Sequence, residues 1–156
     1  MTPRRRPHGF TLAEALISIL VLCTLGMLAM PMLGEMVMNH RVRSAAFELL
    51  STLNYARSEA IKRNNSVTIA ALGPGWESGW RVIEPGGSVM KLRPPIPGGV
   101  RIVGPGNVVY ERDGRLPQVG ANATFDVNVD PAHTGVEARC VRIDLSGRVS
   151  TRRGSC

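Results

Sequence analysis

The longest apolar run of the chain extends from Ala15 to Gly34, twenty consecutive residues without a charged side chain. With a rise of ~1.5 Å per residue, a helix of this length spans a hydrocarbon core of ~30 Å. A soluble domain of this size rarely buries a helix that is apolar on every side. The run therefore predicts a transmembrane helix, which we place at residues 10–34.

Beyond Gly34 the apolar residues follow helical spacing instead of forming a continuous run. One face carries Val42, Ala46, Leu49, Leu53, Ala56 and Ala60. Charged residues lie largely off this face, which is typical of a helix that packs on a sheet. The pattern predicts a helical stalk over residues 35–65 that stops at Asn64-Asn65. A single helix is thus expected from Phe10 to about Arg63.

From Ser66 onward, short runs with β-like composition alternate with turns rich in Gly and Pro. The expected strands are Val67–Leu72, Gly79–Glu84, Val89–Arg93, Val108–Arg112, Thr124–Val129 and Ala138–Leu145. No helical pattern separates any two of them, so the sheets should be largely antiparallel. The fold class is therefore α+β: a long N-terminal helix packed on a β-rich globular head over residues 66–156.

The residues before the apolar run indicate the orientation of the chain. Arg4, Arg5 and Arg6 precede the run without an acidic neighbour, which places the N-terminus in the cytoplasm and exports the rest. A secretory signal peptide fits poorly, because the run is too long and its best late cleavage site, Ala29-Met30-Pro31, contains a proline. Two interpretations remain. The run is either a plain single-pass anchor or part of a segment that is processed before the run, at Gly9-Phe10.

Glu14 favours processing at Gly9-Phe10. A carboxylate within an apolar membrane helix costs ~2.5–3.5 kcal/mol at the centre and less near an end. A plain anchor has no use for it, whereas cleavage after Gly9 would create an amine on Phe10 about one helical turn away. Amine and carboxylate could then neutralise each other within one chain or between chains. The alternative is a side chain that simply snorkels to the interface.

The stretch "RRRPHGFTLAEALISILVL" resembles the type IV prepilin signature. The resemblance implies a leader at residues 1–9, cleavage between Gly9 and Phe10 by prepilin peptidase, and N-methylation of Phe10. It also implies that Glu14 guides the subunit into a growing filament. Ala13 departs from the pattern, where isoleucine or leucine is commoner. Pro31 lies where such helices commonly have a kink-forming proline, although membrane helices also tolerate proline.

Two further stretches resemble the GspH/FimT family of minor pilins and type II secretion pseudopilins: "LNYARSEAIKRNNSVTIA", and "WESGWRVIE" as its next strand. The resemblance implies a type IV pilin-like fold and a single-pass protein of the bacterial inner membrane with a periplasmic head. Its partners would be other pilins or pseudopilins. The function implied is that of a minor pilin in type IV pilus assembly, with DNA uptake as a further candidate role. The alternative is an H-type minor pseudopilin of a type II secretion system.

The three cysteines are divided between the predicted membrane helix and the exported head. Cys23 lies within the apolar run and acts as a small apolar residue. Cys140 and Cys156 lie in the exported part, where an oxidising compartment favours a disulfide. Two free thiols are the alternative. A metal site is not expected, because two sulfurs without a nearby histidine supply too few ligands.

The positive charge is concentrated near the C-terminal end. The chain carries a formal charge of +7. Loss of the three leader arginines leaves +4, and residues 10–138 hold eleven basic and eleven acidic residues. The whole surplus therefore falls in residues 139–156, which we expect to form a basic loop closed by the disulfide.

This basic loop is a candidate DNA-binding site through Arg142, Arg148, Arg152 and Arg153. Some FimT-like minor pilins bind DNA through a Gly-Arg-x-Arg motif. Gly147-Arg148-Val149-Ser150 departs from that motif, because a serine replaces its second arginine. Any contact should be mainly to the DNA backbone, since the loop lacks aromatic residues for stacking. The alternative is a solvated face, or a patch that pairs with acidic surfaces of neighbouring subunits.

No pattern in the chain indicates an enzyme or a cofactor. The three histidines, His8, His40 and His133, are scattered along the sequence, and no glycine-rich phosphate loop connects a strand to a helix. Asp126, Asn128 and Asp130 have ligand-like spacing, but the rest of a calcium loop is missing.

Overall fold

The computed structural model describes residues 10–117, 123–129 and 135–156, with the side chains of residues 28–33 left out of the description. The chain divides into two compact units, Met1–Gly34 and Glu35–Cys156. We call the second one the head unit. Each unit is described by itself.

A single helix, α1, extends from Leu12 to Arg63, close to the expected bounds. It begins after Thr11, whose Oγ1 accepts a hydrogen bond from the backbone N–H of Glu14 at 3.3 Å. It ends at Asn64, which has a left-handed φ of 51°. The N–H groups of Asn64 and Asn65 bond back to the carbonyls of Ile61 and Ala60, which closes the helix as a Schellman motif.

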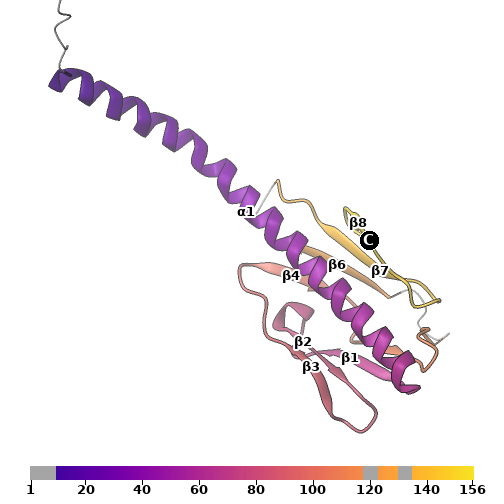
Figure 1. Ribbon diagram of the computed structural model, residues 1–156. Helices are drawn as coiled ribbons and strands as arrows, with labels where there is room; N and C mark the ends of the chain where they lie inside the picture. The colour runs from indigo at the N-terminus through magenta and orange to yellow at the C-terminus, as the bar shows by residue number, and fades with distance from the viewer. Residues whose placement is uncertain (1–9, 118–122, 130–134) are drawn as a thin grey trace, which may run out of the picture. The chain divides into compact units, whose positions relative to one another are not determined.

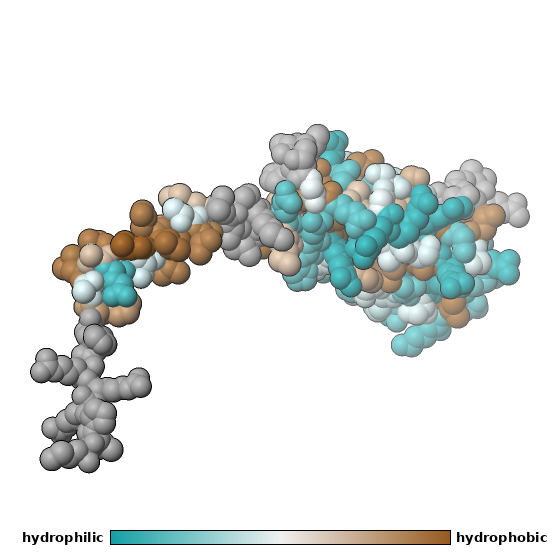
Figure 2. All heavy atoms as spheres, turned by 90° about the horizontal axis from the view of Figure 1, so that it is seen from above, coloured by the Kyte–Doolittle hydropathy of each residue, from teal (hydrophilic) through white to brown (hydrophobic). Residues whose placement is uncertain are grey.

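The first half of α1 is apolar on its exposed surface. Its large side chains are between 49% and 79% exposed from Leu12 to Met27, and most of this segment appears brown in Figure 2. Within the described residues, no helix is both long enough and apolar enough to cross a membrane.

The described strands of the head unit form two antiparallel sheets (Figure 1). The strands are β1 Val67–Ala71, β2 Trp80–Ile83, β3 Val89–Arg93, β4 Val100–Val103, β5 Asn107–Tyr110, β6 Thr124–Val129, β7 Arg139–Ile143 and β8 Val149–Arg153. One sheet has the order β3-β2-β1-β5 and the other the order β4-β6-β7-β8. This arrangement confirms the α+β fold class.

The second half of α1 lies across both sheets (Figure 1). The six residues of the predicted apolar stripe are at most 1% exposed. They pack in one core with alternate residues of the strands, among them Ile69, Trp80, Phe125 and Val141. Every residue of this core lies in the head unit, so the unit has the hydrophobic core it needs to fold without residues 1–34.

Two strands, β4 and β8, were not predicted from the sequence. β4, Val100–Val103, follows the Pro- and Gly-rich stretch 94–99 and was not among the expected strands. β8 lies in the tail that we expected to be a loop, and that expectation was wrong. Its sequence, Val-Ser-Thr-Arg-Arg, has no fully buried residue, so periodicity gives no signal, and pairing with β7 holds it in place.

Trp76 does not begin a strand, as the quoted family stretch suggested. It lies in a short 3-10 helix, η1, Trp76–Ser78. Its indole N–H donates to the carbonyl of Pro105 at 2.6 Å, and its ring meets Phe125 edge-on with centroids 4.9 Å apart. Trp76 therefore joins the two sheets instead of extending one of them.

Candidate functional site

The first candidate site is the beginning of α1. Phe10 precedes the helix and is 75% exposed, while Glu14 lies in the first turn. Thr11 and Glu14 have the Thr-x-x-Glu spacing of a capping box, and a carboxylate in the first turn is favoured by the helix dipole. Gly9 lies outside the described residues. Cleavage at Gly9-Phe10 and methylation of Phe10 therefore stay predictions.

Pro31 lies within the helical span of α1. The helical assignment is continuous on both sides of it, and its side chain is not described. A kink at Pro31 stays a prediction.

The second candidate site is the β7–β8 hairpin, which replaces the expected basic loop. Cys140 is paired with Cys156, and Cys140 is 1% exposed. The expected disulfide is thus present. It fastens the segment after β8 to the middle strands of the sheet, where Sγ of Cys156 lies 3.3 Å from the carbonyl oxygen of Phe125.

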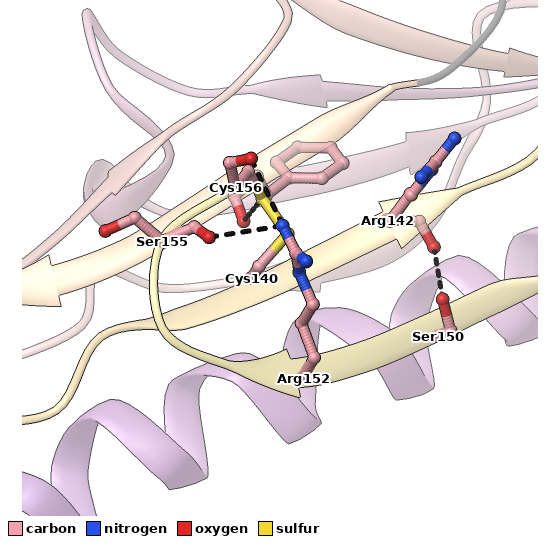
Figure 3. Close-up of a disulfide and its surroundings, with 7 residues drawn as sticks. Cys140, Arg142, Ser150, Arg152, Ser155 and Cys156 are labelled. Carbon is pink, nitrogen blue, oxygen red and sulfur yellow. Dashed lines mark hydrogen bonds between the residues drawn. A yellow bond between two sulfur atoms is a disulfide. The ribbon is translucent and has the colours of Figure 1, made fainter.

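The register of the hairpin divides the predicted arginines between two faces. Cys140 lies opposite Arg152 and Arg142 opposite Ser150, so these residues share the outer face of the sheet. Figure 3 shows Arg152 reaching toward the disulfide and Arg142 pointing away from it. The guanidinium of Arg152 donates to the carbonyls of Ser155 and Cys156 at 3.3 and 3.2 Å.

Arg148 is exposed in the turn before β8, and Asp144 organises that turn. The Asp144 carboxylate accepts hydrogen bonds from the Ser146 hydroxyl at 2.5 Å and the Arg148 N–H at 3.1 Å. The Ser146 hydrogen bond is the main cause that lowers the pKa of Asp144, with smaller effects from backbone N–H groups and the Arg148 charge. Arg142, Arg148 and Arg152 are therefore exposed on or beside one face.

Arg153 does not join these three residues. It lies opposite Arg139, on the face of the hairpin that turns toward the core, and it forms an ion pair with Glu137 at 3.8 Å. The structure therefore does not bring Arg153 together with Arg142, Arg148 and Arg152, and a role of Arg153 in DNA binding stays a prediction. Side chains alternate between faces along a strand, so Arg152 and Arg153 point to opposite sides. The sequence signal that could have shown this is the alternation within β8.

A polar cluster at the other end of α1 serves the fold. Glu59 is only 9% exposed and accepts a hydrogen bond from Nε of Arg63 at 2.7 Å. This bond is the main cause that lowers the pKa of Glu59, and Lys62 adds to it. Arg63 also bonds to Glu84 at 3.0 Å, so the cluster fastens the end of the helix to the residue after β2.

The described residues offer no metal centre. No group of three or more His, Cys, Asp and Glu side chains comes together among them. Asp126 and Asn128 lie on the outer face of β6, and each has a buried Oδ1 without a hydrogen-bond partner. Asp130 lies outside the described residues.

Comparison with known proteins identifies the family. The model of the family described as Type II transport protein GspH matches residues 45–147, more than half of the chain. The chain belongs to the GspH family. No curated protein sequence matches this GspH-family chain. The GspH/FimT resemblance of the sequence is thereby confirmed.

Solved structures agree with this assignment at the level of the fold. The type IV minor pilin FimU from Pseudomonas aeruginosa PAO1 is similar with a TM-score of 0.64 and 23% identity, covering 72% of this chain and 89% of FimU. A second crystal form of FimU has a TM-score of 0.58 and 25% identity, covering 70% of this chain and 91% of FimU. The minor pseudopilin EpsH of the Vibrio cholerae type 2 secretion system has a TM-score of 0.57 and 10% identity, covering 72% of this chain and 96% of EpsH.

Proposed function

We propose that this GspH-family protein is a structural subunit of an envelope filament, a minor pilin or minor pseudopilin, and not an enzyme. The first half of α1 inserts into the bacterial inner membrane, and the head unit lies in the periplasm. The observation that carries the proposal is Glu14. It is an exposed carboxylate in the first turn of a helix whose large side chains are apolar and exposed as far as Met27.

The mechanism is the neutralisation of that carboxylate. Prepilin peptidase removes residues 1–9, which leaves an amine on Phe10. An unpaired carboxylate is costly in an apolar environment, so Glu14 favours a position where a positive group meets it. The Phe10 amine of a subunit already in the filament is such a group. Incorporation then lets the apolar helices pack together as the filament leaves the membrane.

The test is the incorporation of Glu14→Gln into filaments of a host that lacks its own copy of the chain. We expect the variant to reach the membrane fraction at the wild-type level but to be absent from purified filaments. Glu35→Gln is the matched control, since Glu35 is another exposed acid on α1. Normal incorporation of Glu14→Gln would overturn the mechanism.

Processing is tested separately by mass spectrometry of the purified chain. We expect the mature protein to begin with N-methylated Phe10. Gly9→Val should keep the leader attached, because the peptidase acts at the Gly9-Phe10 bond. An unprocessed wild-type chain would contradict the proposed leader.

Within the family we favour the pilus over the secretion system. The support is sequence identity, which is 23% and 25% with FimU and 10% with EpsH, whereas the TM-scores of 0.58 for the second FimU form and 0.57 for EpsH do not separate the two. The alternative is an H-type minor pseudopilin. Deletion of the chain separates the two: loss of surface pili and twitching supports the first, and periplasmic accumulation of normally secreted proteins supports the second.

DNA binding is a second candidate function, favoured by the exposed Arg142, Arg148 and Arg152 at the outer face of the hairpin. Guanidinium groups on one surface can contact successive phosphates, with affinity that falls as salt rises. We would titrate the oxidised head unit with a short DNA duplex at several salt concentrations. Arg142→Gln/Arg148→Gln/Arg152→Gln should weaken binding and flatten its salt dependence.

The matched control is Arg81→Gln/Lys91→Gln/Arg112→Gln, which removes the same charge at exposed positions of the other sheet and its flank. An equal loss in this control, or no binding even at low salt, would reduce the outer face to a packing surface and leave filament assembly as the function.

A further inference from the structure

A basic hollow lies beside the first turns of α1 within the head unit. Its lining includes Met36, His40 and Arg43 from the helix, Glu137 before β7, Arg139 at the start of β7, and Arg153 at the end of β8. Three guanidinium groups and one imidazole thus lie around the Glu137 carboxylate, and a second carboxylate, that of Glu35, lies against Gly135 at the edge of the hollow. None of these residues belongs to the outer face of the hairpin.

The fold holds like charges together in this hollow. Arg139 and Arg153 are direct cross-strand partners, an arrangement in which like charges repel. Glu137 offsets part of the repulsion through its 3.8 Å contact with Arg153. The position of Glu137 is fixed by Asn39, which accepts a hydrogen bond from the Glu137 N–H at 2.8 Å and donates to the carbonyl of Gly135 at 3.2 Å. The hollow therefore has a built frame and an excess of positive charge.

Apolar side chains accompany this charge. Met36 is 67% exposed and Val37 is 52% exposed. The guanidinium carbon of Arg43 lies 5.6 Å from the centre of the exposed Phe47 ring. Basic groups beside exposed apolar groups match the boundary between phosphate headgroups and acyl chains in a bilayer.

The sequence puts the hollow close to that boundary. Met36 and Arg43 follow the end of the uncharged run by two and nine residues, which corresponds to about 3 Å and about 14 Å along a helix. We propose that the basic hollow binds the phosphate groups of anionic phospholipids and docks the head unit on the membrane surface before filament assembly. This inference rests on the proposed membrane insertion of α1.

The test is the binding of the oxidised head unit, residues 35–156, to vesicles. We would compare vesicles of phosphatidylcholine alone with vesicles that contain 30% phosphatidylglycerol. We expect binding only to the anionic vesicles. Arg43→Gln/Arg139→Gln/Arg153→Gln should weaken it by about fivefold per arginine, since each basic group near such a surface contributes about 1 kcal/mol.

The control variant Arg81→Gln/Lys91→Gln/Arg112→Gln should bind the anionic vesicles like the wild type. Equal binding to both kinds of vesicle, or equal losses in the two triple variants, would overturn the proposal. Displacement by millimolar glycerol phosphate would also overturn it, because the hollow would then be a site for free phosphate esters. A negative result with vesicles would not change the outcome expected for Glu14→Gln in filament incorporation. The lipid-binding proposal and the filament proposal can therefore be refuted independently.

Discussion

At the scale of single residues, Gly147 and Gly114 mark the closest approach of two turns. Both have a positive φ, +77° and +74°, and a Cβ built on Gly147 would collide with the carbonyl oxygen of Gly114. Arg57 holds the two turns together. Its Nε donates to the carbonyl of Gly114 and its Nη2 to that of Ser146, each at 3.0 Å. The end of the β7–β8 hairpin is therefore fixed to α1 by glycine contacts and one guanidinium group.

Gly147→Ala should consequently destabilise the head unit by about 2–4 kcal/mol, from left-handed strain and a backbone collision. Gly86→Ala is the matched control, because a Cβ there meets nothing within 4 Å. It should be neutral or slightly stabilising. Urea unfolding of both variants measures the difference, and similar unfolding midpoints would contradict the prediction.

Asp144 makes the stability of the head unit depend on pH through the turn between β7 and β8. Its pKa is lowered in the folded state, first by the Ser146 hydrogen bond, whereas its unfolded pKa is about 3.9. The ionised group therefore stabilises the fold above that value, and the contribution is lost as the pH falls through the folded pKa.

We expect wild type to be more stable than Asp144→Asn at pH 6, and the difference to shrink below about pH 4. Urea unfolding midpoints between pH 2.5 and 7 measure this. Ser146→Ala should reproduce part of the effect, because it removes the first of the hydrogen bonds to Asp144. A difference that stays constant with pH would refute the assignment.

At the scale of elements, β8 depends on the disulfide more than on burial. It is an edge strand without a fully buried side chain. Cys140–Cys156 closes a loop of 16 residues, for which the chain-entropy model gives about 3 kcal/mol. Reduction should lower the free energy of unfolding by about that amount and raise hydrogen exchange in β8 before β6.

The control for this prediction is Cys23→Ser, which removes the exposed free cysteine of α1 and should leave exchange in the head unit unchanged. Equal exchange of β8 in the oxidised and reduced proteins would show that pairing with β7 alone holds the strand.

The elements also show which parts of the fold the sequence could predict. The apolar stripe that runs from Val42 to Ala60 is buried by packing that repeats at helical spacing, so its pattern predicted both the helix and its core face. β8 has no such pattern, because it is held in place by pairing with β7 and by the disulfide between Cys140 and Cys156. The arginines of the tail were predicted as a group by composition, but only the cross-strand register separates Arg152 from Arg153. Composition carries no information on register, so the basic hollow was missed as well.

At the scale of the whole molecule, the stability of the head unit should not depend on the first half of α1. Leu53 is fully buried in the core, whereas Leu20 is 65% exposed. Leu53→Ala should therefore cost about 2–5 kcal/mol, and Leu20→Ala should leave thermal unfolding of the head unit unchanged. Calorimetry of the full chain and of residues 35–156 tests this. A large effect of Leu20→Ala would show that the two units unfold together.

The alternation of side chains in β8 has a consequence for how this tail can diverge. One inserted or deleted residue between the hairpin turn and Arg152 would shift the phase of the strand and exchange the side chains of its two faces. The composition and net charge of the tail would stay nearly the same. Two relatives with equally basic tails can therefore present that charge to opposite sides. Whether each arginine lies an odd or an even number of residues from the turn is more informative than how many arginines the tail contains.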